Sequence, residues 1–184
     1  MKKILFVSHC ILNTASKVVM DDRVSLRQEE EVRLAFLKKA LEQGVQFIQL
    51  PCPEFTLYGC KRWGHVSNQF DNPFFRKHCQ ELLYPYILQA KEYLNDKRKY
   101  QVLGFVGIDG SPSCGVKYTC SGQWGGSYQD GNTWAKKVST VKLVKKEGIY
   151  MQVLKQLLKE EDLSLPVIGL YAPEKERLFA LLDE

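Results

Sequence analysis

The feature that most constrains the fold is a pattern that occurs three times: a short apolar run that ends in a tight turn carrying a cysteine. The three pairs of run and cysteine are Ile4–Val7 with Cys10, Val45–Leu50 with Cys52, and Val102–Val106 with Cys114. Short apolar runs rich in β-branched and aromatic residues predict buried strands. Ligands of an open parallel sheet bind beyond the carboxyl ends of its strands, so three thiols delivered to that edge can converge on one point.

Helical patterns alternate with these strands. Apolar residues recur at helical spacing over 26–43, after the Asn72-Pro73 pair, over 147–161 and after Pro173. Pro85 lies inside the second pattern and is expected to kink or interrupt that helix. The alternation predicts a three-layer α/β/α sandwich, Rossmann-like or flavodoxin-like, with a mainly parallel four-stranded sheet and the cysteines at its C-terminal edge. The predicted strands are Lys3–Val7, Val45–Leu50, Gln101–Val106 and Val167–Leu170.

The 184 residues predict one domain, spanning 1–184. The periodic pattern weakens over about 116–146, where glycines and tryptophans alternate. We interpret this stretch as an irregular flap or β-ribbon near the site.

Composition excludes several classes of protein. After the first three residues the apolar run lasts only from Ile4 to Val7, whereas a signal-peptide core needs roughly 7 to 15 residues. A cytoplasmic protein with no membrane partner is therefore expected. The net charge of +5 comes from scattered basic residues, a pattern that does not favour a nucleic-acid partner. No oligomeric state is predicted.

Cysteine spacing narrows the chemistry. The six cysteines include no C-x-x-C pair, so neither a thioredoxin-type site nor a zinc ribbon is indicated. A cysteine phosphatase would need an arginine six positions after its cysteine to clamp phosphate. Ser16 stands at that position after Cys10, and Cys120 stands there after Cys114. In a reducing compartment the cysteines are thus expected to be core residues, metal ligands or catalytic thiols.

Three thiolates at one sheet edge suit a soft metal centre. Zinc with an open position and a [4Fe-4S] cluster bound through three of its irons are both compatible with Cys10, Cys52 and Cys114. Cys79 falls on the apolar stripe of a helix and is expected in the core. Cys60 and Cys120 are expected to be non-ligands, although a fourth sulfur from either would close the site.

The three cysteine motifs resemble those of a known family. Ser8-His9-Cys10-Ile11-Leu12-Asn13, Pro51-Cys52-Pro53-Glu54 and Ser111-Pro112-Ser113-Cys114-Gly115 are similar, in order and approximate spacing, to the signature stretches of the TudS-type thiouracil desulfidases. The chain departs from the family pattern at His9 and Asn13, in the loop after Glu54 and in the segment from Gly122. The resemblance therefore places it in a divergent branch.

The resemblance implies an activity. Cys10, Cys52 and Cys114 would bind a [4Fe-4S] cluster whose open iron takes up the sulfur of a small-molecule thiocarbonyl compound, such as a thiouracil or thionucleotide. Water would then replace that sulfur, which leaves as sulfide. Glu54, which can alternatively cap a helix, would pass protons. Ser111 and Ser113 would donate hydrogen bonds, unless they only cap their turn.

Five further residues are assigned to substrate binding. Arg62 and Lys117 could meet a phosphate on the substrate, and Tyr58 belongs to an aromatic loop of the kind that forms substrate walls. His9 could orient the substrate or carry a proton, and Asn13 follows in the same motif. Two alternatives stay open: a non-catalytic iron-sulfur or zinc protein acting as sensor or scaffold, and a nucleotide-binding module with no metal.

Overall fold

A computed structural model describes residues 1–18, 23–126 and 131–183. Four parallel strands form one sheet in the order β2-β1-β3-β6. The strands are β1 (Lys2–Val7), β2 (Gln46–Gln49), β3 (Tyr100–Ile108) and β6 (Val167–Leu170). All four predicted strands are thus confirmed, and β3 continues two residues further than predicted, into the stretch that carries Cys114.

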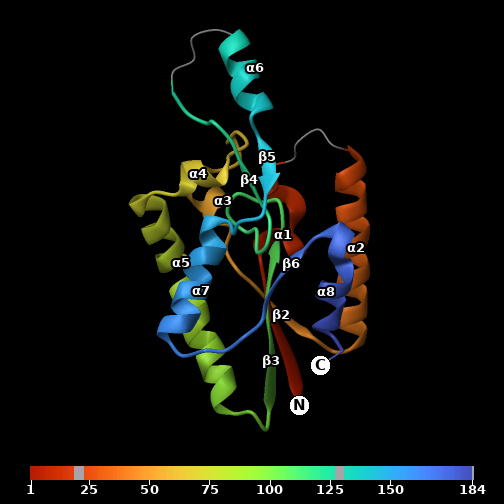
Figure 1. The fold of residues 1–184 in the computed structure, drawn as a ribbon. Helices are drawn as coiled ribbons and strands as arrows, with labels where there is room; N and C mark the ends of the chain where they lie inside the picture. The colour runs from red at the N-terminus through yellow and green to blue at the C-terminus, as the bar shows by residue number, and fades with distance from the viewer. Residues whose placement is uncertain (19–22, 127–130, 184) are drawn as a thin grey trace.

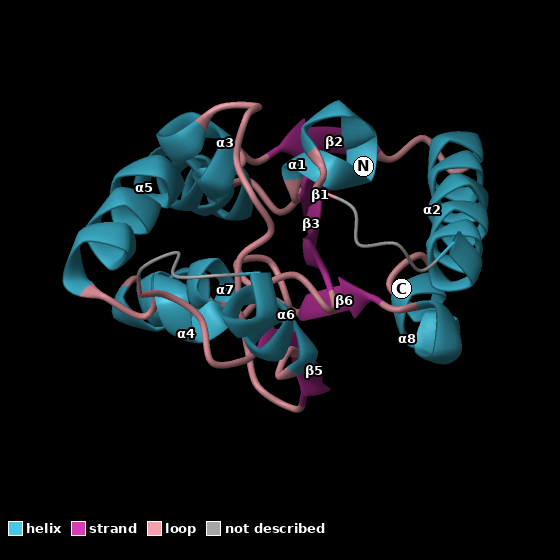
Figure 2. Cartoon of the chain, turned by 90° about the horizontal axis from the view of Figure 1, so that it is seen from above, coloured by secondary structure: helices cyan, strands magenta, loops and turns pink. Residues whose placement is uncertain are grey.

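Helices cover both faces of the sheet, which gives the three layers that the sequence predicts (Figures 1 and 2). The two long helices are α2 (Arg23–Glu42) and α5 (Pro73–Asn95), on opposite faces. Beside them lie α8 (Lys175–Ala180) and α7 (Ile149–Glu160), respectively. The shorter elements are α1 (His9–Leu12), η1 (Thr14–Ser16), α3 (Pro53–Tyr58), α4 (Ser67–Phe70) and η2 (Ala172–Glu174).

The core has one half on each side of the sheet. The larger half contains Phe6 and Phe105, whose rings stack at 4.8 Å between centroids on β1 and β3. It also holds the apolar faces of α5 and α7. The other half joins β-strand residues such as Val7 and Val106 to α2 and α8, with Phe36 of α2 fully buried. Alternate strand residues therefore anchor opposite helical layers.

Pro85 does not interrupt its helix, so that alternative of the prediction is wrong. Helix α5 runs from Pro73 to Asn95 with Pro85 inside it. Cys79, Leu83 and Ile87 on its inner face are fully buried. Proline in a helix interior costs about 3 kcal/mol, and burial of several large side chains, at about 1.5–3 kcal/mol each, outweighs it.

The predicted flap over 116–146 contains regular structure. Strands β4 (Thr119–Ser121) and β5 (Lys142–Val144) form an antiparallel ribbon, as one of the two predicted alternatives has it. Helix α6 (Gly131–Ser139) lies between them in sequence and extends beyond the sheet in Figure 1. Residues 127–130 of the flap lie outside the described residues. Among the helices described, none is long and apolar enough to cross a membrane.

Candidate functional site

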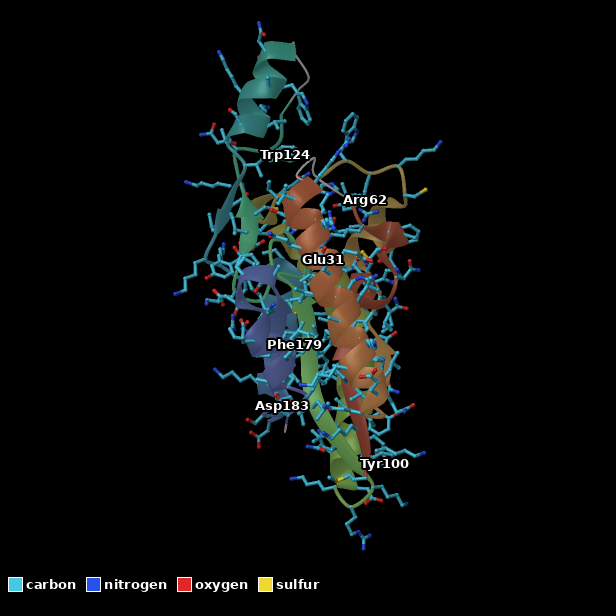
Figure 3. All side chains as sticks on the ribbon, turned by 90° about the vertical axis from the view of Figure 1, so that its right-hand side faces the viewer. Glu31, Arg62, Tyr100, Trp124, Phe179 and Asp183 are labelled. Atoms are coloured by element: carbon cyan, nitrogen blue, oxygen red, sulfur yellow. The ribbon has the colours of Figure 1, made fainter. Side chains whose placement is uncertain are left out.

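Three cysteines follow three adjacent strands of the sheet. Cys10 lies in α1 directly after β1, Cys52 precedes α3 after β2, and Cys114 lies in the turn after β3. Because β2, β1 and β3 are parallel neighbours, their carboxyl ends share one edge. Arg62 lies near this end in Figure 3, whereas Tyr100, at the start of β3, lies at the opposite end.

The three thiols line a single cavity of about 280 Å³. Glu54, Arg62 and His65 line the same cavity. Within the described ranges, no three His, Cys, Asp or Glu side chains meet the geometry of a site for a single metal ion. The structure thus brings the predicted cysteines to one cavity, and it does not gather them around one ion-sized point.

Burial and mutual proximity raise the pKa values of these thiols. Burial is the larger cause for Cys10, and the neighbouring Cys52 adds to it, so that the pKa of Cys10 is raised to about 11. Burial, with Cys52 and then Cys10 as further causes, raises the pKa of Cys114 well above its ordinary value. Burial also raises the pKa of Cys52. Without a bound cation, deprotonating three such neighbours together is unfavourable, whereas a metal-bound thiol is deprotonated outright.

Local hydrogen bonds fix the first two cysteines. The Cys52 sulfur accepts a hydrogen bond from the backbone N–H of Phe55 at 3.4 Å, as the cap of α3. The Cys10 sulfur lies 3.8 Å from the hydroxyl of Ser16. Both sulfurs are therefore held by the turn that follows their strand.

The Cys114 turn is held by close backbone packing. Ser111 Oγ accepts hydrogen bonds from the N–H groups of Cys114, at 3.0 Å, and Ser113, at 3.3 Å. Gly115 and Gly148 let neighbouring backbone approach: a Cβ on Gly115 would lie 2.1 Å from the Tyr118 carbonyl oxygen, and one on Gly148 would lie 2.5 Å from that of Ser113. Ser111 thus caps its turn.

Asp109 fixes the segment that follows the Cys114 turn. Its Oδ1 accepts hydrogen bonds from the backbone N–H groups of Val116, Lys117 and Tyr118 at 2.7, 2.7 and 3.1 Å. Asp109 is buried, where charge-assisted hydrogen bonds are strong. The end of β3 therefore carries both the cysteine turn and the clamp that holds it.

Glu54 connects the Cys52 turn with the Cys114 turn. It is buried on α3, and its Oε1 accepts a 2.7 Å hydrogen bond from Ser113 Oγ. Its Oε2 lies 3.6 Å from Arg62 Nε and 3.7 Å from His65 Nδ1. Glu54 is thus a buried carboxylate in the cavity that the three thiols share.

No protein-family model matches the chain, and no solved structure matches it. An archaeal protein, "Uncharacterized protein MJ0003" of Methanocaldococcus jannaschii, is 34% identical to it over 115 residues. That alignment covers 62% of this chain and 69% of the archaeal one. The chain belongs to the MJ0003 family.

In this member of the MJ0003 family, the predicted site residues divide into two groups. The cavity is lined by the three predicted cysteine ligands and also by Glu54, Ser111, Ser113, His9 and Arg62. Three predicted substrate-binding residues are not among its lining residues. They are Asn13, which accepts from Ala15 N at 2.9 Å; Tyr58, which stacks on His65 at 5.0 Å; and Lys117, which pairs with Glu174 at 2.7 Å.

The other cysteines of this MJ0003-family chain lie in three environments. Cys79 is fully buried in the core, as predicted. Cys60 is exposed. Cys120 lines the cavity, where its thiol donates to the His65 carbonyl oxygen at 3.4 Å and burial raises its pKa to about 11. A fourth thiol is thus present at the site.

Ser8 and His65 are among the cavity residues that are not predicted as individual site residues. Ser8 is buried beside Cys114, and its hydroxyl favours the thiolate of that cysteine, although it makes no hydrogen bond of standard geometry within the described residues. His65 belongs to the basic and aromatic loop after α3. Two features of the sequence could have identified them. Ser8 stands two residues before Cys10, and His65 lies three residues after Arg62.

Proposed function

We propose that this protein is a [4Fe-4S]-dependent desulfidase that removes sulfur from a thiocarbonyl compound by hydrolysis. The observation that carries the proposal is one shared cavity. Cys10, Cys52 and Cys114 reach it from three adjacent strand ends, together with the buried Glu54. The likeness of the three motifs to those of TudS-type desulfidases supports the same assignment.

The donor set suits the cofactor. Thiolates are the usual ligands of iron-sulfur clusters, and here the thiols of Cys10, Cys52 and Cys114 share one cavity. Cys10, Cys52 and Cys114 would hold the cluster. When bound, it would supply an iron without a protein ligand, a Lewis acid suited to a soft thiocarbonyl sulfur.

The residues around the cluster would bind and activate water. Glu54 would accept a proton from water, and the hydrogen bond from Ser113 to its Oε1 supports this role. The overall reaction converts C=S and water into C=O and hydrogen sulfide, so that no net electron transfer occurs. Glu54 would return the proton to the departing sulfide.

The size of the cavity limits the substrate. Small-molecule sites start at about 300 Å³, and this cavity, at about 280 Å³, would also have to hold the cofactor. We therefore infer that only the ring bearing the thiocarbonyl group enters, as in a thiouracil. A sugar or phosphate would then extend out of the cavity, whose lining includes Lys17 and its ion-pair partner Glu29.

Cys120 favours one alternative. Because its thiol lines the same cavity, four sulfurs could close an iron-sulfur or zinc site and leave no position for substrate, as in a sensor or scaffold. The variant Cys120→Ser separates the two functions. A desulfidase keeps its iron and turnover without this thiol, whereas a closed four-thiol site loses metal.

The proposal is tested by assaying sulfide release from thiouracils, thionucleotides and other thioamides with anaerobically prepared protein. We expect release by wild type and none by Glu54→Ala, which should keep its iron. A cluster-loaded wild type that is inert on every thiocarbonyl would refute the enzymatic function. Loss of iron with residual activity in Glu54→Ala would refute the role of that residue.

A further inference from the structure

One wall of the cavity carries three ionisable side chains that are almost completely buried. The exposed fractions of the Arg62, Glu54 and His65 side chains are 5, 10 and 10%. All three line the cavity. Such groups are rarely buried without a partner or a function.

Three polar atoms of these side chains lie near one another without a direct hydrogen bond between them: Glu54 Oε2, Arg62 Nε and His65 Nδ1. Glu54 Oε1 is taken by Ser113, whereas Oε2 lies 3.6 Å from Arg62 Nε and 3.7 Å from His65 Nδ1. These distances exceed those of a direct hydrogen bond. Neither nitrogen makes a hydrogen bond to any part of the chain that the structure describes. Most buried polar atoms in native proteins have partners. Two such nitrogens near one carboxylate oxygen therefore indicate a polar ligand.

Other contacts fix the side chains of Arg62 and His65 in place. Arg62 Nη1 donates to the Gly59 carbonyl oxygen at 3.1 Å, and Nη2 donates to that of Ser16. The His65 ring packs against the rings of Tyr58 and Phe70, with centroids 5.0 and 4.8 Å away. The two unpaired nitrogens are thus held in position independently of Glu54.

We propose that Arg62 Nε, His65 Nδ1 and Glu54 Oε2 together bind one water molecule, the reactant of the hydrolysis. This inference rests on the proposed function. Arg62 donates to the water oxygen and Glu54 accepts one of its protons. His65 supplies a third hydrogen bond, and three polar partners are typical of a buried water.

This water would attack the thiocarbonyl carbon. Its oxygen bonds to the thiocarbonyl carbon while Glu54 takes one proton. The carbon–sulfur bond then breaks, and the sulfur leaves as hydrogen sulfide with that proton and the second proton of the water. Arg62 and His65 change neither charge nor bonding during these steps. They are positioning residues, and both lie outside the three cysteine motifs of the amino-acid sequence.

Substitutions at His65 test the assignment by kinetics. His65→Phe keeps a ring between Tyr58 and Phe70 but removes Nδ1, and His65→Asn restores an amide group near its place. We expect His65→Phe to lower kcat roughly 10- to 100-fold, with iron content kept and KM within about twofold. His65→Asn should recover most of that loss. Unchanged kcat in His65→Phe, or loss of iron in it, would overturn the role.

The arginine is tested with a matched control. Arg62→Lys keeps a cation but removes Nε, and we expect the same fall in kcat at unchanged iron content. Arg27→Lys makes the same change at a side chain that is 83% exposed on α2 and should have wild-type kinetics. Equal kcat in the two variants would contradict the role of Arg62 in binding water.

Crystal structures of wild type and His65→Phe separate this inference from the proposed function. We expect an ordered water within about 3.2 Å of all three atoms in wild type, and its loss in His65→Phe. A wild-type structure without that water overturns the inference even if sulfide is released. Wild-type protein that releases no sulfide from any thiocarbonyl refutes the proposed function, and the inferred reactant role of the water with it.

Discussion

Ser113 Oγ donates a 2.7 Å hydrogen bond to Glu54 Oε1 across 59 positions of sequence. This hydrogen bond joins the turn after β2 to the turn after β3. Because Cys52 and Cys114 lie in these same two turns, one hydrogen bond sets the carboxylate relative to two of the three thiols. Buried polar contacts of this kind fix geometry strongly, since either partner left alone is costly.

The variant Ser113→Ala tests that contact. We expect iron content to be kept and kcat to fall roughly 100-fold, because a positioned donor is lost beside the reacting group. The free energy of unfolding should fall by about 1–3 kcal/mol, since a buried carboxylate oxygen loses its donor. Sulfide-release kinetics and urea denaturation measure the two effects. Wild-type turnover in this variant would show that Glu54 needs no such support.

Gly148 is predicted to be required for the Cys114 turn. A Cβ at this position would lie 2.5 Å from the Ser113 carbonyl oxygen, so Gly148→Ala must push the turn away. We expect a loss of about 1–3 kcal/mol in urea denaturation, as for overpacked sites, and weakened iron retention. Gly131→Ala is the control, because a Cβ there meets no atom within 4 Å. Equal stability of the two variants would contradict the close packing.

Asp109→Ala removes the acceptor of three backbone N–H groups, those of Val116, Lys117 and Tyr118. We expect it to lower the free energy of unfolding by about 2–3 kcal/mol. Hydrogen exchange at these amides should also become faster than in wild type. Unchanged exchange would mean that other contacts hold this segment.

The pH dependence of stability should report on Glu174. Hydrogen bonds from Lys117 first, and then from Tyr118 and Arg177, lower the pKa of this carboxyl from 4.5 to about 2. A depressed folded-state pKa contributes stability that is fully present above pH 4.5 and is lost as the pH falls toward 2. Glu174→Gln should therefore flatten the acid side of a pH–stability profile. A profile identical to that of wild type would show that solvent screens these contacts.

The sequence predicted the sheet because its strands are short β-branched and aromatic runs, each ending in turn residues. It placed Cys10, Cys52 and Cys114 at one edge for the same reason, since the carboxyl ends of parallel strands coincide. The expected interruption of the helix at Pro85 is wrong because burial of the apolar face of α5 overrides local propensity. Local sequence propensities do not predict tertiary packing of this kind.

Side-chain convergence within irregular segments was harder to predict. Arg62 and His65 meet Glu54 only because the loop after α3 folds back over its own helix, and no periodic pattern marks that return. Lys117, expected near substrate, pairs instead with Glu174 at the end of the chain, 57 positions away. Such contacts depend on how separate loops pack together.

We propose that three thiols from adjacent strand ends hold one iron-sulfur cluster. The most direct test of this proposal is the iron and acid-labile sulfide content of anaerobically reconstituted wild type, Cys10→Ser, Cys52→Ser and Cys114→Ser, with the exposed Cys60→Ser as control. We expect about four iron and four sulfide per chain in wild type and control, and nearly none in the other three variants. Wild-type protein without iron, or a full complement in any of those three variants, would contradict the proposal.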